Sequence, residues 1–196
     1  MNTKHPQLTA ETRQNLMTAF WQLYQTTPLS KITVGQITAI AGYNRGTFYH
    51  YFSDIYHVLE TIEEDLLATI RKNIFEQVLH APETILQQIE PLAKLYTQEG
   101  AYLAKLLGEN GDPAFLHKFI QVLHDCLATN LSQRDTLSPQ QELTITFAGT
   151  AIIYSFMYWY QHQDQLTPEE AIKAIQYLLK EGCYAALTPP FPSSQQ

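Results

Sequence analysis

Cysteine is scarce in this sequence, since Cys126 and Cys183 are the only two among 196 residues. Two cysteines do not form a disulfide framework in a chain of this size. Both lie on predicted apolar helical faces, so we expect them to be small core residues. Long apolar runs are also missing, because no stretch approaches the roughly 20 residues that a transmembrane helix needs. With no recognisable secretory leader, these features favour a cytoplasmic protein that has no membrane partner.

Positive charge is in short supply as well, with 12 lysines and arginines against 19 acidic residues and a net charge of -7. Residues 1–60 carry four basic and three acidic side chains, whereas the remainder carries eight basic and sixteen acidic ones. The acidic excess therefore lies beyond residue 60, which permits a nearly neutral nucleic-acid-binding segment on an acidic body. A merely solvated acidic surface is equally consistent with the charge.

Sequence motifs of common enzymes are lacking too. The chain has no phosphate-binding glycine loop, no paired histidines of the metalloprotease kind and no nucleophile elbow. The carboxylates in "IEEDLL" stand early in a long predicted helix, where acidic side chains favour the helix dipole and solvent. His117, His124 and Cys126 lie within ten residues, but zinc sites normally need closer pairs and a fourth ligand. We therefore expect no enzymatic activity, no metal and no cofactor.

Helical periodicity dominates the sequence, and no segment shows a convincing alternating strand pattern. The pattern predicts an all-α fold with about nine helices. In "TAETRQNLMTAFWQLYQTT", Leu16, Phe20, Leu23 and Tyr24 recur on one face of a helix that ends before Pro28. A long helix is expected from about residue 54 to 79. Further helices are predicted near residues 83–98, 101–108, 113–131, 139–162 and 168–186.

Residues 33–52 have the pattern of two short helices joined by a glycine. Thr33 and Gln36 have capping-box spacing at the start of the first helix, and Gly42 follows its end. Asn44 is a suitable N-cap for the second helix. Together with the preceding helix, they predict a helix-turn-helix unit. The predicted organisation is a DNA-binding domain over residues 1–54, a ligand-binding and dimerisation domain over 55–187 and a flexible tail over 188–196.

The second of these short helices, in "GYNRGTFYHYF", carries aromatic residues on two sides. Phe48, Tyr51 and Phe52 recur at i, i+3 and i+4, so they can close the core of the small domain. Arg45 and Tyr49 fall on the other side. Arginine can bond guanine in the major groove, and tyrosine can bond a phosphate, so this side is a candidate DNA-binding face. The alternative is that all of these aromatics serve the core.

Residues 9–60 resemble the N-terminal domain of the tetracycline-repressor (TetR) family of transcriptional regulators, in "LTAETRQNLMTAFWQLY" and "TVGQITAIAGYNRGTFYHYFSDIYHVL". The resemblance implies phosphate contacts from Thr33, Tyr49 and Tyr51. It implies positions in the major groove for Tyr43, Asn44, Arg45, Thr47 and His50. Two residues depart from the family pattern: Ile55 replaces a usual lysine, and Tyr51 replaces a frequent histidine. Losing the lysine should weaken binding to the DNA backbone and its dependence on salt.

The segment "ELTITFAGTAIIYSFMYWYQ" is apolar nearly all round, so a helix there must be buried on both sides. One side is expected to face its own domain and the other a second subunit. The alternative is the central helix of a monomer. The residues predicted at a homodimer interface are Gly149, Ile152, Phe156, Trp159, Ile175 and Leu179.

Regulators of this build hold a small-molecule cavity, and tyrosines can supply apolar walls with orienting hydroxyls. The candidate lining residues are Tyr96, Tyr102, Phe119, Leu123, Phe147, Tyr154 and Tyr158. The segments "LLGENGDPAF", "AGTAIIYSFMYWY" and "LTPEEAI" are similar to regulators of dihydroxyacetone-kinase operons, some of which are co-activators. The resemblance thus implies a dimeric repressor of double-stranded operator DNA, controlled by a small-molecule effector. The alternative is an adaptor of the same fold that acts through protein contacts and binds DNA weakly.

Overall fold

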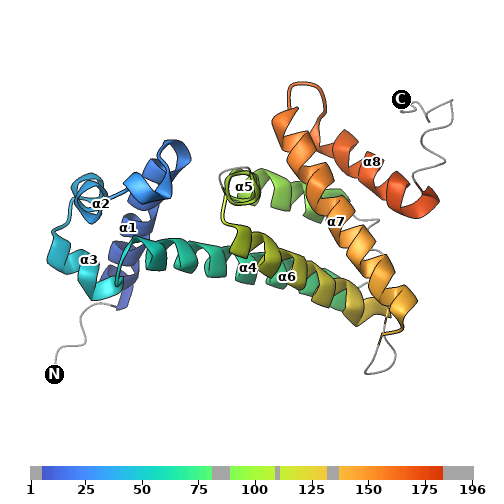
Figure 1. The fold of residues 1–196 in the computed structure, drawn as a ribbon, viewed down its shortest axis with the longest axis horizontal. Helices are drawn as coiled ribbons and strands as arrows, with labels where there is room; N and C mark the ends of the chain where they lie inside the picture. The colour runs from blue at the N-terminus through green and yellow to red at the C-terminus, as the bar shows by residue number, and fades with distance from the viewer. Residues whose placement is uncertain (1–5, 81–88, 109–110, 132–136, 183–196) are drawn as a thin grey trace. The chain divides into compact units, whose positions relative to one another are not determined.

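The computed structural model describes residues 6–80, 89–108, 111–131 and 137–182, and every regular element in these ranges is a helix (Figure 1). The predicted all-α fold is therefore confirmed for the described residues. None of these helices is both long enough and apolar enough to cross a membrane. The elements are α1 (Pro6–Thr26), the 3-10 helix η1 (Leu29–Lys31), α2 (Val34–Ala41), α3 (Arg45–Tyr51), α4 (Ile55–His80), α5 (Ile89–Leu107), α6 (Pro113–Leu131), α7 (Pro139–Gln161) and α8 (Pro168–Glu181).

The chain divides into two compact units, Met1–Leu66 and Leu67–Gln196. In the first unit, three of the four residues in the predicted apolar stripe of α1 are inside the core, with Leu16 and Phe20 fully buried and Tyr24 3% exposed, while Leu23 is half-buried. Helix α1 packs against α2, which in turn packs against α3. Phe48 and Phe52 of the α3 region are also buried, at 0% and 1% exposure. The three helices therefore share one core, which is rich in aromatic side chains.

The turns around α2 and α3 follow the predicted local chemistry. The Thr33 hydroxyl accepts a hydrogen bond from the Gln36 backbone N–H at 3.3 Å, and Gln36 Oε1 accepts one from the Thr33 backbone N–H at 2.9 Å. Gly42 ends α2 with φ of 75°, a left-handed conformation that glycine adopts without steric cost. Asn44 caps α3 by accepting from the Thr47 backbone N–H at 2.8 Å. Sequence and structure agree on the helix-turn-helix arrangement.

Helix α4 contributes residues to both units. Asp54 caps its start by accepting from the His57 backbone N–H at 2.9 Å. Within the first unit, Arg13 of α1 lies 3.6 Å from the Asp65 carboxylate of α4 and 5.9 Å from the ring centroid of Phe52. Because α4 is continuous past Leu66, it is the element that leads directly from the first unit into the second.

The second unit differs from the prediction in one helix. Two helices were predicted near 83–98 and 101–108, but the described part forms the single helix α5; residues 83–88 lie outside the described residues. Gly100 is buried inside α5, and a Cβ atom there would lie 3.4 Å from the ring of Tyr160 on α7. The glycine therefore permits close packing and does not end a helix. This fusion leaves eight α-helices in the described residues where about nine were predicted.

The last two helices of this unit start as the sequence predicts. Helix α7 has a capping box formed by Ser138 and Gln141, and α8 has one formed by Thr167 and Glu170. The two helices are joined by a turn and pack against each other (Figure 1). Helix α8 is described as far as Glu181, and the end of the predicted helix, at residues 183–186, lies outside the described residues.

Candidate nucleic-acid interface

Helix α3 separates its aromatic side chains onto two sides. Phe48 is completely buried, whereas Tyr49 beside it is 59% exposed and meets the Phe48 ring edge-on at 5.5 Å. Arg45 and His50 are exposed as well. Tyr51, which was expected to help seal the core, is only half-buried, and its ring meets the His50 ring edge-on at 4.9 Å. The buried phenylalanines thus hold α3 in place, and the exposed side chains on its outer side end in polar groups.

Arg45 is the arginine on this outer side, and its guanidinium carries a permanent positive charge. Among the residues that the structure describes, no carboxylate lies within ion-pairing distance of its guanidinium, and no side chain accepts a hydrogen bond from it. A guanidinium carries five N–H donors in a planar fork that matches phosphate oxygens and the acceptor edge of guanine. All of these donors are available to a ligand from outside the protein.

Asn44 and Thr47 form the cap of α3. The Asn44 Oδ1 atom accepts from both the backbone N–H and the hydroxyl of Thr47, at 2.8 and 3.2 Å. A Cβ atom on Gly46 would lie 3.1 Å from that same oxygen, so a side chain there would crowd the cap. Because Gly46 has no side chain, the hydrogen bonds of the Asn44 cap are left undisturbed. The amide nitrogen of Asn44 and the Thr47 side chain are what remain for contacts with DNA.

Thr33 is occupied by its own helix. Its backbone N–H and its hydroxyl both donate to Gln36 Oε1, each at 2.9 Å. A hydrogen bond from the Thr33 hydroxyl to a phosphate therefore has to replace one within the capping box. The exposed position of Thr33 suits the contact that the family resemblance implies, but its hydrogen-bonding state makes that contact costly.

Tyr43 has a partner that the sequence did not reveal. The amide of Asn15 on α1 donates to the Tyr43 hydroxyl at 3.1 Å, which leaves the tyrosine's own O–H free to donate elsewhere. Besides Asn15, the sequence pattern did not single out Tyr56 as a candidate DNA contact. This tyrosine is 60% exposed on the first turn of α4, next to the half-buried Ile55. The signal for Tyr56 was an aromatic residue amid the polar segment "SDIYH", just past the predicted DNA-binding helix.

Helix α7 in the second unit buries, within one chain, part of the face that was predicted to contact a second subunit. Phe156 and Trp159 were assigned to a surface for a second subunit, but each is only 4% exposed within one chain. The Trp159 indole N–H also donates to the Leu166 backbone carbonyl at 2.9 Å. Gly149 is buried too, with its Cβ position 4.0 Å from Leu123 Cβ on α6. These three assignments are corrected, because α6 and the turn after α7 already cover this face.

The opposite face of α7 is open. Phe147, Tyr154 and Tyr158, which were predicted to line a cavity, are 58%, 59% and 57% exposed, and Leu143 is 72% exposed. Side chains this exposed do not line an interior cavity of the chain. The remaining interface candidates, Ile152 of α7 with Ile175 and Leu179 of α8, are half-buried.

The other predicted lining residues lie deeper in the second unit. Phe119 and Leu123 of α6 are 6% and 7% exposed. Tyr102 of α5 is half-buried, and burial, with a smaller contribution from the Glu99 carboxylate, raises the pKa of its hydroxyl. The phenol therefore stays protonated at neutral pH and can donate a hydrogen bond. The side chain of Tyr96 lies outside the described part of the structure.

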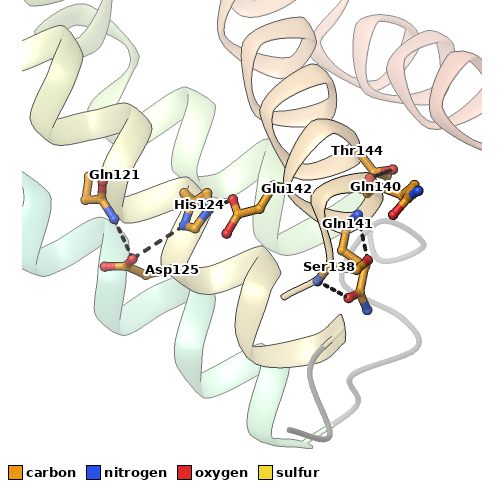
Figure 2. A network of polar contacts seen from close by, with 8 residues as sticks. All are labelled: Gln121, His124, Asp125, Ser138, Gln140, Gln141, Glu142 and Thr144. Carbon is orange, nitrogen blue, oxygen red and sulfur yellow. Dashed lines mark hydrogen bonds and ion pairs between the residues drawn. The ribbon is translucent and has the colours of Figure 1, made fainter. Parts of the chain in front are cut away.

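The histidines considered as metal ligands have other partners. His124 Nε2 lies 2.8 Å from a Glu142 carboxylate oxygen, and the neighbouring Asp125 accepts from Gln121 at 2.8 Å (Figure 2). Asp125 also lies 3.6 Å from Arg71. Among the described residues, no group of three or more His, Cys, Asp or Glu is arranged to hold a metal ion. These ion pairs and hydrogen bonds between side chains join α4, α6 and α7.

Cys126 follows this network on α6 and is 2% exposed. Burial raises the pKa of its thiol to about 11, with Arg71 acting in the opposite direction. The thiol is therefore protonated and inert at neutral pH, as expected for a core cysteine. Cys183 lies outside the described residues.

Comparisons with known proteins agree with this architecture. A TetR family model described as "Transcriptional regulator C-terminal region" matches residues 83–181, about half of the chain. No curated protein matches the sequence. A TetR transcriptional regulator from Streptococcus agalactiae 2603V is 24% identical, with 88% of this chain and 95% of that chain covered and a TM-score of 0.63.

Two further solved structures share the fold at lower identity. A putative TetR-family regulator from Syntrophomonas wolfei str. Goettingen is 19% identical over 94% of this chain and 99% of that chain, with a TM-score of 0.70. The dihydroxyacetone kinase operon activator DhaS is 18% identical over 86% of this chain and 93% of that chain, with a TM-score of 0.57. The family model thereby confirms the predicted TetR resemblance, and these structures share the predicted fold.

Proposed function

This chain belongs to the TetR family of transcriptional regulators, and from that premise we propose that it is a repressor that binds operator DNA as a homodimer. A small-molecule effector controls its affinity for the operator. Residues 1–54 form the DNA-binding domain, and residues 55–187 bind the effector and the second subunit. The protein acts in the cytoplasm, where operator DNA is accessible.

The outer side of α3 carries the proposal for DNA binding. Arg45, Tyr49 and His50 are exposed on a helix that Phe48 anchors in the core, so their backbone is fixed before DNA arrives. A preformed helix of this size fits the major groove, which is about 12 Å wide. Arg45 bonds a base edge, and the tyrosine hydroxyl bonds a phosphate. The further contacts come from Thr33, Tyr43, Asn44, Thr47 and Tyr51, with Tyr56 added.

The open face of α7 supports the homodimer. Phe147, Tyr154 and Tyr158 form an exposed apolar stripe along the helix with Leu143, and exposed patches of this kind mark protein interfaces. A two-fold axis places the same stripe on both subunits, so one apolar face meets its copy. The half-buried α8 side chains Ile175 and Leu179 complete the contact, whereas Ile152 lies nine residues after Leu143 on the opposite side of α7 and is left out of it.

The effector is proposed to bind in the second unit, near Tyr102, Phe119 and Leu123. A protonated tyrosine hydroxyl would suit the one polar group of a ligand, and the apolar side chains Phe119 and Leu123 would suit a largely apolar body. Helix α4 transmits the effect, because its 26 residues continue from the first unit into the second. Effector binding shifts the population between two orientations of the DNA-binding domains, and only one of them matches the operator.

A binding experiment tests the DNA-binding role. The wild-type protein selects sequences from a random duplex pool long enough for two half-sites about 10 base pairs apart. Its affinity for the selected duplex is then compared with that of Arg45→Ala. We expect Arg45→Ala to weaken binding about 5- to 150-fold for each of the two half-sites, because a bidentate contact with a base contributes about 1–3 kcal/mol.

Lys173→Ala is the matched control, since it removes one exposed positive charge from α8 in the second unit. It should leave affinity within about twofold of wild type. Equal losses for the two variants would mean that only overall charge matters. A failure of the pool to yield any preferred sequence would favour the adaptor of the same fold, for which the missing lysine at Ile55 is the strongest argument.

A further inference from the structure

Gly35 occupies the first turn of α2 without a backbone reason for being a glycine. The described glycines with positive φ are Gly42 and Gly182, so Gly35 has an ordinary helical backbone. In a helix, glycine is less favourable than alanine by about 1 kcal/mol. Glycine at residue 35 therefore makes α2 less stable than alanine would. The space that a side chain at this residue would fill offers a reason.

That space is taken by the guanidinium of Arg45. A Cβ atom on Gly35 would lie 3.2 Å from Arg45 Nη2 and 3.9 Å from Arg45 Nε, closer at the first atom than ordinary van der Waals contact. Two nitrogens of one planar group at this distance mean that Arg45, the first residue of α3, lies against the backbone of the first turn of α2. The nearest other atom is Thr33 Oγ1, at 3.9 Å.

Electrostatic attraction does not explain this position. The start of α2 is the positive end of a helix dipole, which repels a cation. Among the described residues, no carboxylate pairs with Arg45. Steric room at Gly35 is the feature that allows the guanidinium to lie there. An anion or an acceptor edge placed against it would relieve the unfavourable charge.

We propose that Gly35 is a positioning residue for DNA recognition, which acts by leaving room for the Arg45 guanidinium to lie against α2 before DNA binds. This inference rests on the proposed function and specifies how its central arginine is prepared. An exposed arginine that moves freely loses side-chain entropy when a base fixes it, whereas a prepositioned one loses less. A Cβ atom at residue 35 would displace the Arg45 guanidinium by a few tenths of an ångström, and a larger side chain would displace it further, which restores part of that cost.

A double-mutant cycle tests the proposal on the full-length protein with the duplex selected by wild type. Gly35→Ala should weaken binding about two- to tenfold, and the bulkier Gly35→Val should weaken it more. In an Arg45→Ala background, Gly35→Ala should have no effect on affinity. Thermal unfolding of Gly35→Ala should occur at the same or a higher temperature than for wild type, because alanine favours the helix.

The results separate this inference from the proposed function. Unchanged affinity of Gly35→Ala, with Arg45→Ala weakened, would overturn the positioning role and leave the proposed function intact. Equal losses from Gly35→Ala with and without Arg45 would also overturn it, since the glycine would then act through the α2 backbone. If Arg45→Ala itself bound as wild type, the arginine contact in the proposed function would be wrong, and the inference with it.

Discussion

Helices α3 and α7 each bury one aromatic side and expose another, but the two exposed sides differ in chemistry. On α3, the exposed residues are Arg45, Tyr49 and His50, all with polar tips. On α7, the exposed stripe includes Leu143 and Phe147, which have none. A polar-tipped side suits a partner with phosphates and base edges, whereas an apolar stripe suits another protein surface.

The comparison teaches that exposure alone does not identify a partner. Tyr49 and Tyr154 are both 59% exposed, so the chemistry of the neighbouring side chains has to distinguish their roles. Tyr49 stands near the Arg45 guanidinium on a short helix within residues 1–60, which carry four basic and three acidic side chains. Tyr154 stands among apolar groups in the acidic second unit. The same residue type therefore serves two different interfaces in our account.

The largest expected effect contrasts the two sides of α3. Phe48→Ala leaves a cavity at a site with 0% exposure, and such a change costs about 3–5 kcal/mol of the free energy of unfolding. Tyr49→Ala, one residue away on the exposed side, should change it by about 0.5 kcal/mol or less. Urea denaturation measures both. Similar losses for the two variants would contradict the division of α3 into a core side and an outer side.

A second effect concerns the α7 stripe. Replacing Phe147 and Tyr154 together by aspartate places four charges in a two-fold interface, so the dimer should dissociate at least about 100-fold more readily. Analytical ultracentrifugation over a range of protein concentrations gives the dissociation constant. The matched control is Gln14→Asp with Ser30→Asp, which adds the same charge to exposed sites of the first unit. Dimers that survive the α7 substitutions unchanged would exclude this stripe as the interface.

The smallest effect restores the lysine that the family usually has at the start of α4. Ile55→Lys adds one phosphate contact per subunit, so the plot of log affinity against log salt should steepen by about 0.9 for each subunit. Titrations with the selected duplex between low and physiological salt measure the slope. Ile55→Gln, which has similar length and no charge, should keep the wild-type slope. An unchanged slope for the lysine variant would place the start of α4 away from the DNA backbone.

Local signals in the sequence predicted most of the helices. The capping box at Thr33, the glycine at Gly42 and the N-cap at Asn44 each act within one turn, so the sequence contains all that they require. Gly100 misled the prediction because its effect depends on Tyr160, which is 60 residues away. Whether a glycine ends a helix or admits a neighbour is decided by tertiary packing.

The predicted sites on α3 and α7 show the same limit of prediction from local sequence signals. On α3, the buried side consists of phenylalanines and the outer side has polar tips, so composition distinguishes them. On α7, both sides are apolar, and the positions of other elements, among them α6 and the turn at Leu166, decide which one is covered. The partners of Tyr43 and Arg45, at Asn15 and Gly35, likewise come from other helices and had no local signal.

Hydrogen exchange with and without the selected duplex tests the central claim most directly, because it reports on both helices in one experiment. Our account predicts that DNA slows the exchange of backbone amides over residues 33–51 and leaves α7 as it is in the free dimer. Slower exchange confined to α7 and α8, with residues 33–51 unchanged at saturating duplex, would contradict the assignment of α3 to DNA.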